Sequence, residues 1–433
     1  MLRQIKKIIA ESPILEVTSF ISFGLVVKLA SGFVVSKLSA VFLGAKGLAL
    51  IGNLRNALLV LQNISTIGLN KGVVKYSSEY KDDAEKFKVF ISTLMWLLLL
   101  VSVLTFVIIF FFSDQLAIYV FEDKSFNYIF KLTAVLLPIY AINTFLIAIL
   151  QGFEKFKKVV RINIFIHVLN LVLFSYLIYE FGLNGALIAI VVVPSASLII
   201  TLFLANQEIQ IWHYFDLNVF SRTQLRHFGQ YALMTLISAV SFPMVYLLIR
   251  QAIADAIDID AAGYWEACFR LSAIYLLFIQ YLLNLYILPK LVQAKTRSQF
   301  RAIIFDYYRQ IVPLFAFGLL VIFILRDYII WLVFSKEFLP VTEIIGWQII
   351  ADLFRVVALV LTYQFHAKKM IWHYILTDLF LALCLYFSAI YGLKYFELRG
   401  VVIGHAVTYA LYFLLILFIF RNAIFGTLQS ENQ

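Results

Sequence analysis

Seven Asp, Glu, Lys and Arg side chains stand well inside long apolar stretches of this sequence, where such groups are rare. They are Lys28, Arg55, Glu266, Arg270, Asp352, Arg355 and Asp378. Each costs at least about 2.5–3.5 kcal/mol at the centre of a membrane, so it should face a cavity or a charged partner. The chemistry open to such groups is ion pairing, proton transfer and recognition of a charged ligand.

Two pairs of these groups have helical spacing. Glu266 and Arg270 are four residues apart, and Asp352 and Arg355 are three apart. Both spacings put the two charges on one face of a helix. Each pair either neutralises itself and holds the bundle together or takes part in the protein's function. Asp352 and Asp378 are the acids best placed to carry a coupling proton, followed by Glu266.

Lys28 and Arg55 have no acid at such spacing in their own apolar stretches. At 1.5 Å per residue, Lys28 lies about 12 Å or more from either end of its stretch. Either an acid from another helix pairs with these bases, or they form a cationic site in the N-terminal half. An unpaired buried positive charge fits an anionic ligand, and arginine matches phosphate oxygens with two parallel hydrogen bonds.

Motifs for other chemistry are missing. The sequence has no glycine-rich phosphate loop, two-histidine metal spacing or nucleophile elbow, so neither ATP hydrolysis, a metal nor a cofactor is expected. Cys268 and Cys384 both lie in apolar stretches, which indicates no disulfide framework. His167 and His405 also lie within such stretches, as hydrogen-bonded packing residues or as functional groups.

The composition identifies the elements that must position these residues. Of 433 residues, 63% are hydrophobic and 14% charged, and the mean hydropathy is +0.93. A soluble domain has about 45–50% apolar and about 25% charged residues, so this is an integral membrane protein. The net charge of +10 is spread along the chain, which favours membrane topology over nucleic-acid binding. Spans of about 20 apolar residues are predicted at 14–36, 47–69, 89–112, 128–150, 160–179, 184–205, 226–250, 262–288, 305–325, 341–365, 372–392 and 400–420.

The basic residues predict the orientation of these twelve spans. With the N-terminus inside, inner segments carry 21 Lys and Arg residues and outer segments carry 9, with Arg250 among the outer ones. Cytoplasmic loops are the ones enriched in Lys and Arg, so both termini are predicted to be cytoplasmic. The connections are short and leave no room for an extramembrane catalytic domain.

An internal repeat divides the chain. A shift of 213 residues places Asp114–Phe121 over Asp327–Phe334, and a shift of 215 places Leu183–Gly185 over Leu398–Gly400. The repeat predicts two six-helix lobes, 1–212 and 213–433. Because six is even, both lobes insert the same way and frame a central cavity, which is a transporter's architecture.

Five segments resemble a known family. Val27–Gly32, Asn53–Asn56, Asn70–Tyr76, Gly263–Ser272 and Trp347–Arg355 are similar to signatures of Wzx-type polysaccharide flippases. The likeness is greatest to the branch for O-antigen and enterobacterial common antigen (lipid III), within the multidrug/oligosaccharidyl-lipid/polysaccharide exporter superfamily.

The resemblance implies an all-α, MATE-like transporter of the bacterial inner membrane, and not an enzyme. It implies alternating access for undecaprenyl-pyrophosphate-linked oligosaccharide units, moved from the cytoplasmic to the periplasmic leaflet. Lys28, Arg55 and Arg270 are then expected to line the cavity and receive the pyrophosphate. Membrane lipids and polysaccharide polymerase machinery are the other expected partners.

Two other functions remain open from the sequence. A cation-coupled multidrug antiporter of the same superfamily should have an acid-rich N-terminal cavity, whereas this lobe holds buried bases. A membrane-embedded glycan polymerase should have a large periplasmic loop, and the loops here are short. The acidic segment 250–262 is read as a solvated surface, or else as a metal or sugar contact.

Overall fold

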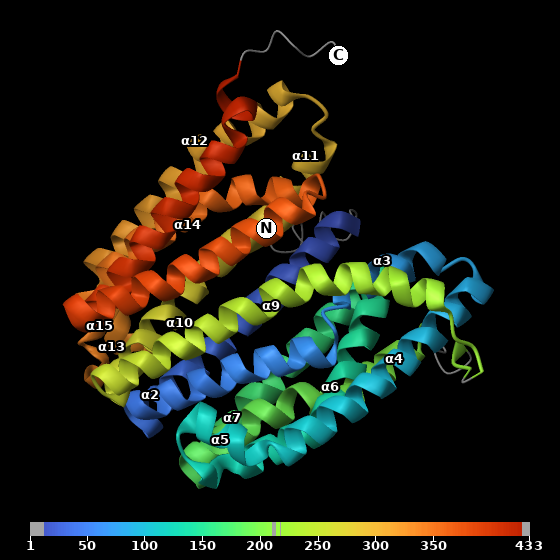
Figure 1. Ribbon diagram of the computed structural model, residues 1–433, viewed down its shortest axis with the longest axis horizontal. Helices are drawn as coiled ribbons and strands as arrows, with labels where there is room; N and C mark the ends of the chain where they lie inside the picture. The colour runs from blue at the N-terminus through green and yellow to red at the C-terminus, as the bar shows by residue number, and fades with distance from the viewer. Residues whose placement is uncertain (1–12, 210–213, 217, 427–433) are drawn as a thin grey trace, which may run out of the picture. The chain divides into compact units, whose positions relative to one another are not determined.

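The computed structural model describes residues 13–209, 214–216 and 218–426, and within these ranges every long regular element is a helix (Figure 1). The basic N-terminal residues up to Lys7 and the predicted lobe boundary at 212 lie outside the described residues. In chain order the elements are α2 (Pro13–Ser65), α3 (Asn70–Tyr80), α4 (Ala84–Phe111), α5 (Ser113–Phe121), η1 (Lys124–Phe126), α6 (Asn127–Gly152), α7 (Phe156–Ala196), α8 (Leu198–Asn206), α9 (Arg222–Ala256), α10 (Ile259–Leu282), η3 (Leu283–Ile287), α11 (Leu288–Gln293), α12 (Arg297–Ile324), α13 (Arg326–Val333), η4 (Lys336–Phe338), α14 (Val341–Ala367) and α15 (Ile371–Phe425).

Nine helical segments of the described chain are long and apolar enough to cross a membrane. Three of them contain a backbone break, at Gly44 in α2, at Gly182 in α7 and at Phe396 and Glu397 in α15. Each break falls where the sequence predicts a tight turn between two spans. Divided at these turns, the nine segments are in keeping with the twelve predicted spans.

The predicted repeat recurs in the backbone. Gly182 has φ 55° and ψ −130°, and Glu397, 215 residues later, has φ 51° and ψ −142°. Glu154 and Lys369, also 215 apart, have φ of 60° and 53°. The short helices α5 and α13 follow α4 and α12 in the same way. The helix α13, which lies between the ninth and tenth predicted spans, is therefore the counterpart of α5.

Two glycines allow the helices beside these turns to approach closely. A Cβ atom on Gly185 would lie 1.9 Å from the carbonyl oxygen of Leu177, and one on Gly400 would lie 1.9 Å from that of Gly392. Distances this short exclude any side chain. Both contacts join residues that are again 215 apart, so the two turns share the same requirement for glycine.

The residue contacts divide the chain into two units. The first holds the residues up to Leu43 and Asn53–Val240, and the second holds Gly44–Gly52 and Ser241 onward. In the first unit, α6 packs against α3, α4, α5, α7 and α8, and in the second, α14 packs against α10, α11, α12, α13 and α15. The repeat places α6 on α14, so each unit is built around the equivalent helix. The lobe boundary at 212 stays a prediction.

The segment that follows α8 is tied to the first unit. Asp216 pairs with Lys88 at 2.9 Å, and Glu208 pairs with Lys155 at 2.6 Å and Lys158 at 2.8 Å. The Lys88 ammonium holds the pKa of Asp216 below its usual range, and the two lysines do the same for the pKa of Glu208. The contacts of the first unit thus continue beyond residue 212.

Candidate functional site

A buried carboxylate on α10 joins two arginines in the second unit. Glu266 accepts a hydrogen bond from Nε of Arg270 at 2.7 Å, and its other oxygen accepts one from Nη2 of Arg250 on α9. The exposed fractions are 4% for Glu266, 7% for Arg270 and 1% for Arg250. The predicted pair of Glu266 and Arg270 is therefore present, but this cluster of three residues keeps one excess positive charge.

Arg270 retains hydrogen-bonding capacity. Its Nη1 and Nη2 atoms are buried and have no hydrogen-bond partner among the described residues. Buried polar groups are ordinarily hydrogen-bonded, and an unsatisfied one is costly. The second unit thus holds a desolvated guanidinium edge that an anionic oxygen would satisfy.

Two glycines make room for this cluster. A Cβ atom on Gly52 would lie 2.6 Å from Oε2 of Glu266 and 2.9 Å from Cζ of Arg250. A Cβ atom on Gly263 would lie 2.0 Å from the carbonyl oxygen of Ala45. The segment Gly44–Gly52 therefore approaches α10 closely enough that glycine is needed on both sides of the contact.

Sequence reasoning misplaced Arg250. The charge count assigns it to an outer segment, but it lies within α9, is 1% exposed and has its guanidinium 5.2 Å from the ring centre of Trp265. The sequence contains a hint of this pairing, because Arg250 ends one predicted span and the acid Glu266 lies on the following span.

A second carboxylate is held by uncharged donors. Asp352 on α14 is 0% exposed and accepts hydrogen bonds from the hydroxyls of Ser272 and Tyr275. Nε2 of Gln348 lies 3.2 Å from both of its oxygens. Nδ1 of His405 lies 3.3 Å from Oε1 of the same Gln348. His405 is thus a buried, hydrogen-bonded residue, and Asp352 belongs to a network that spans α10, α14 and α15.

The spacing of Asp352 and Arg355 does not produce a direct ion pair. Within the described chain the two groups are not within 4.0 Å of each other, and the Arg355 guanidinium lies 5.4 Å from the ring centre of Tyr409. The carboxylate of Asp352 instead accepts its hydrogen bonds from neutral donors, and whether the pair serves structure or function stays a prediction. Asp378 is half-buried in the first part of α15.

The predicted bases of the N-terminal half lie in the first unit. Lys28 on α2 is half-buried and makes no hydrogen bond or ion pair with any residue that the structure describes. Ser31, one turn further on, donates to the carbonyl oxygen of His167 on α7 at 2.9 Å. Arg55 is also half-buried. The meeting of Lys28 and Arg55 with Arg270 at one cavity stays a prediction.

The acidic segment between α9 and α10 has a local structural role. Asp258 caps α10, since its side chain accepts a hydrogen bond from the backbone N–H of Ala261 at 2.7 Å. Asp255 and Asp260 are exposed. This arrangement fits the solvated surface that was expected.

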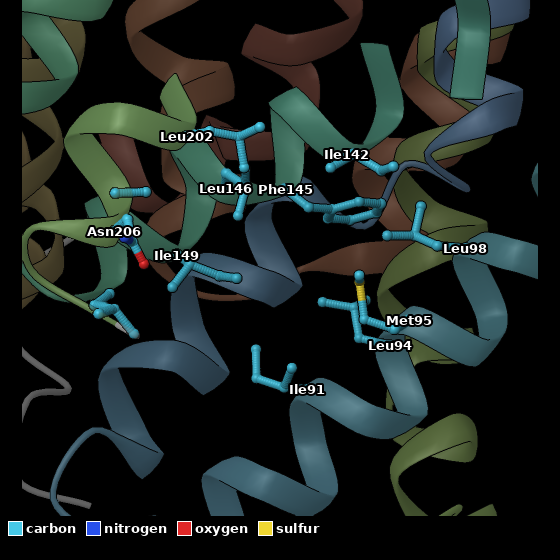
Figure 2. A pocket seen from close by; sticks show the side chains of 12 residues that line it. Ile91, Leu94, Met95, Leu98, Ile142, Phe145, Leu146, Ile149, Leu202 and Asn206 are labelled. Carbon is cyan, nitrogen blue, oxygen red and sulfur yellow. The ribbon is translucent and has the colours of Figure 1, made fainter. Parts of the chain in front are cut away.

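The first unit also contains an apolar pocket between α4, α6 and α8 (Figure 2). Leu94, Leu98, Phe145 and Ile149 are among the side chains that line it, and Asn206 supplies the only polar side chain of the lining. A pocket without charged groups does not suit a pyrophosphate. This pocket is therefore not a candidate for the pyrophosphate site.

Comparison with known protein families shows to which family the chain belongs. The family described as polysaccharide biosynthesis protein matches residues 15–295, more than half of the sequence. The chain belongs to this family. The predicted membership of a polysaccharide flippase family is thereby confirmed, and the matched range includes Lys28, Arg55 and the Arg250, Glu266 and Arg270 cluster.

Two curated relatives of the chain carry a more specific name. The chain is 25% identical to the lipid III flippase of Escherichia coli (strain K12) over 389 residues, covering 89% of this chain and 93% of that protein. The same values hold for the lipid III flippase of Shigella flexneri.

Solved structures show the fold. An inward-facing multidrug resistance MATE family transporter of the MOP superfamily matches with a TM-score of 0.80 and 16% identity, over 95% of this chain and 96% of that one. The lipid II flippase MurJ, in an inward closed conformation, matches with a TM-score of 0.72 and 15% identity, over 94% and 87%. The chain is thus a multi-pass membrane protein with a MATE-like fold, all-α over the residues that the structure describes, as predicted.

Proposed function

We propose that this protein is a flippase that moves undecaprenyl-pyrophosphate-linked oligosaccharide units, of O-antigen or a similar surface polysaccharide, from the cytoplasmic to the periplasmic leaflet of the bacterial inner membrane. It works by alternating access between its two lobes and catalyses no covalent chemistry. Membership of the polysaccharide biosynthesis family and the relatives named lipid III flippase support this substrate class. The matches to MATE transporters reflect the fold and carry no argument for drug export.

One observation carries the proposed substrate site. Arg270 is desolvated, is bound to Glu266 only through Nε, and keeps two terminal nitrogens for a ligand. A pyrophosphate offers several anionic oxygens, and charge-assisted hydrogen bonds contribute about 1.5–3 kcal/mol each. In the proposed mechanism Lys28 and Arg55 supply further positive charge to the same headgroup. Glu266 is the positioning residue that leaves the Nη edge of Arg270 available.

The test compares export with abundance. Lys28→Ala, Arg55→Ala and Arg270→Ala are expected to cut glycan export at least about tenfold, which corresponds to about 1.4 kcal/mol, while membrane abundance is kept. Arg309→Ala, which removes an exposed arginine from α12, is the matched control and should leave export unchanged. Normal export from a well-expressed Lys28→Ala, Arg55→Ala double variant would end the cationic-site proposal.

The proposed orientation has both termini in the cytoplasm. Reporter fusions after residues 80 and 295 should report cytoplasm, and fusions near 120 and 335 should report periplasm. A periplasmic signal at 295 would contradict two lobes of six helices each. The polysaccharide polymerase machinery is the proposed consumer of the flipped product.

A further inference from the structure

A pocket with a largely apolar wall and three charged residues is separate from the ion cluster on α10. This pocket of about 630 Å³ opens between α12 and α14 in the second unit. Its wall is largely apolar and includes Leu319, Leu320, Phe323, Ile350 and Leu353. Leu320, Phe323 and Ile350 are exposed, at 53%, 40% and 42%. The wall therefore forms an apolar groove whose exposed side chains no other part of the described chain covers.

Three charged residues line the same pocket. They are Arg326, at the first residue of α13, Glu343, in the first turn of α14, and Arg399, just after the break in α15. None of the three makes an ion pair with another residue in the part of the chain that the structure describes. All three stand where a spanning helix begins, ends or breaks, which is the depth of lipid headgroups.

Arg326 is held in place for a ligand. Its Nη1 donates to the carbonyl oxygen of Phe323 at 2.9 Å, and its guanidinium lies 4.5 Å from the centre of the Phe323 ring. Its Nε is buried and has no hydrogen-bond partner among the described residues. An orphaned buried donor at the head of an apolar groove points to an acceptor on a ligand that is itself largely apolar.

We propose that this pocket binds a membrane glycerophospholipid with a phosphoethanolamine headgroup. The phosphodiester lies between Arg326 and Arg399, the ammonium group donates to Glu343, and an acyl chain runs along the apolar wall. Glu343 decides between headgroups. It repels a headgroup that carries only negative charge, and a trimethylated amine has no N–H to donate to it. This lipid is a resident partner and does not depend on the proposed transport function.

Native mass spectrometry of the purified full-length protein tests this site. Ethanolamine, glycerol and choline phospholipids with identical acyl chains are added in equal amounts. The ethanolamine lipid should be retained about tenfold over either of the others, which corresponds to about 1.4 kcal/mol. Glu343→Gln should remove that preference, and Arg326→Gln should lower retention of all three lipids.

Two matched control variants distinguish lipid binding at this site from a general effect of removing surface charge. Arg421→Gln removes an arginine that also lies over a phenylalanine ring, at 3.9 Å from Phe418, and Asp327→Asn removes an exposed acid near the pocket. Both should behave as the unmodified protein. Equal retention of the three lipids by that protein, an unchanged preference in Glu343→Gln, or displacement of the bound lipid by undecaprenyl pyrophosphate would each overturn the proposal.

Discussion

Arg270 is bound to Glu266 from the side, through Nε at 2.7 Å, and not through its two terminal nitrogens. A two-pronged pair would have used both carboxylate oxygens and left little of the guanidinium for a ligand. Here the second oxygen belongs to Arg250, so one acid serves two bases. This geometry places a net positive charge in a buried position and keeps its outer edge available.

Gly52 is expected to be essential for this geometry. In Gly52→Ala the new methyl group would lie 2.6 Å from Oε2 of Glu266, so the buried side chains of Glu266 and Arg250 would have to shift. Overpacking of this kind costs about 1–3 kcal/mol. The variant should lose thermal stability in detergent and lose glycan export.

Gly32→Ala is the control on the same helix, because a Cβ atom there meets nothing within 4 Å. It should match the unmodified protein or gain slightly in stability, since alanine favours helix over glycine by about 1 kcal/mol. Equal stability of the two variants would contradict a tight fit at Gly52.

The spans could be predicted well because hydropathy depends on local composition alone. The repeat could also be predicted, because the 215-residue shift matches Leu183–Gly185 with Leu398–Gly400 directly in the sequence. The interruptions of regular α-helix within a span could not be predicted from hydropathy. The predicted span 262–288 is α10 followed by the π-helical turn η3 and by α11, because hydropathy does not report the hydrogen-bonding pattern of a helix.

The candidate site could be predicted only in part, because the sequence shows the spacing of charges along one helix but not the neighbouring helices. Spacing along one helix correctly joined Glu266 to Arg270, but it also joined Asp352 to Arg355, which do not pair. Whether two charges on one face meet depends on donors from neighbouring helices, and Ser272 and Tyr275 take the carboxylate of Asp352. Arg250 was missed because its partner lies on a different helix.

Arg270→Lys separates charge from geometry. A lysine ammonium can pair with Glu266 or bind a ligand, but it cannot present the separate Nε and Nη edges of arginine. We expect export to fall about tenfold or more with little loss of abundance, since the charge opposite Glu266 is kept. Arg309→Lys on α12 is the control. Full export from Arg270→Lys would mean that only the charge matters.

The coupling proposal concerns Asp352. Asp352→Asn keeps the size of the side chain but removes the group that can exchange a proton, so flipping driven by a pH gradient in proteoliposomes should fall about tenfold or more, with substrate binding retained. Tyr275→Phe is the companion variant, since it removes one donor to Asp352 and leaves the carboxylate. Unchanged gradient dependence in Asp352→Asn, Asp378→Asn and Glu266→Gln alike would leave these acids without a coupling role.

The two equivalent turns give a paired prediction about stability. Glu397 has φ 51° and ψ −142°, a conformation that is essentially restricted to glycine and costs other residues about 1–3 kcal/mol. Its side chain is exposed, so Glu397→Gly removes the strain without losing buried contacts and should raise the thermal midpoint. Gly182→Glu imposes the same strain on the first unit and should lower it, because a Cβ atom at Gly182 has nothing within 4 Å and only the backbone is affected. Thermal unfolding of both variants checks this symmetry, and a midpoint that shifts in the same direction in both would refute it.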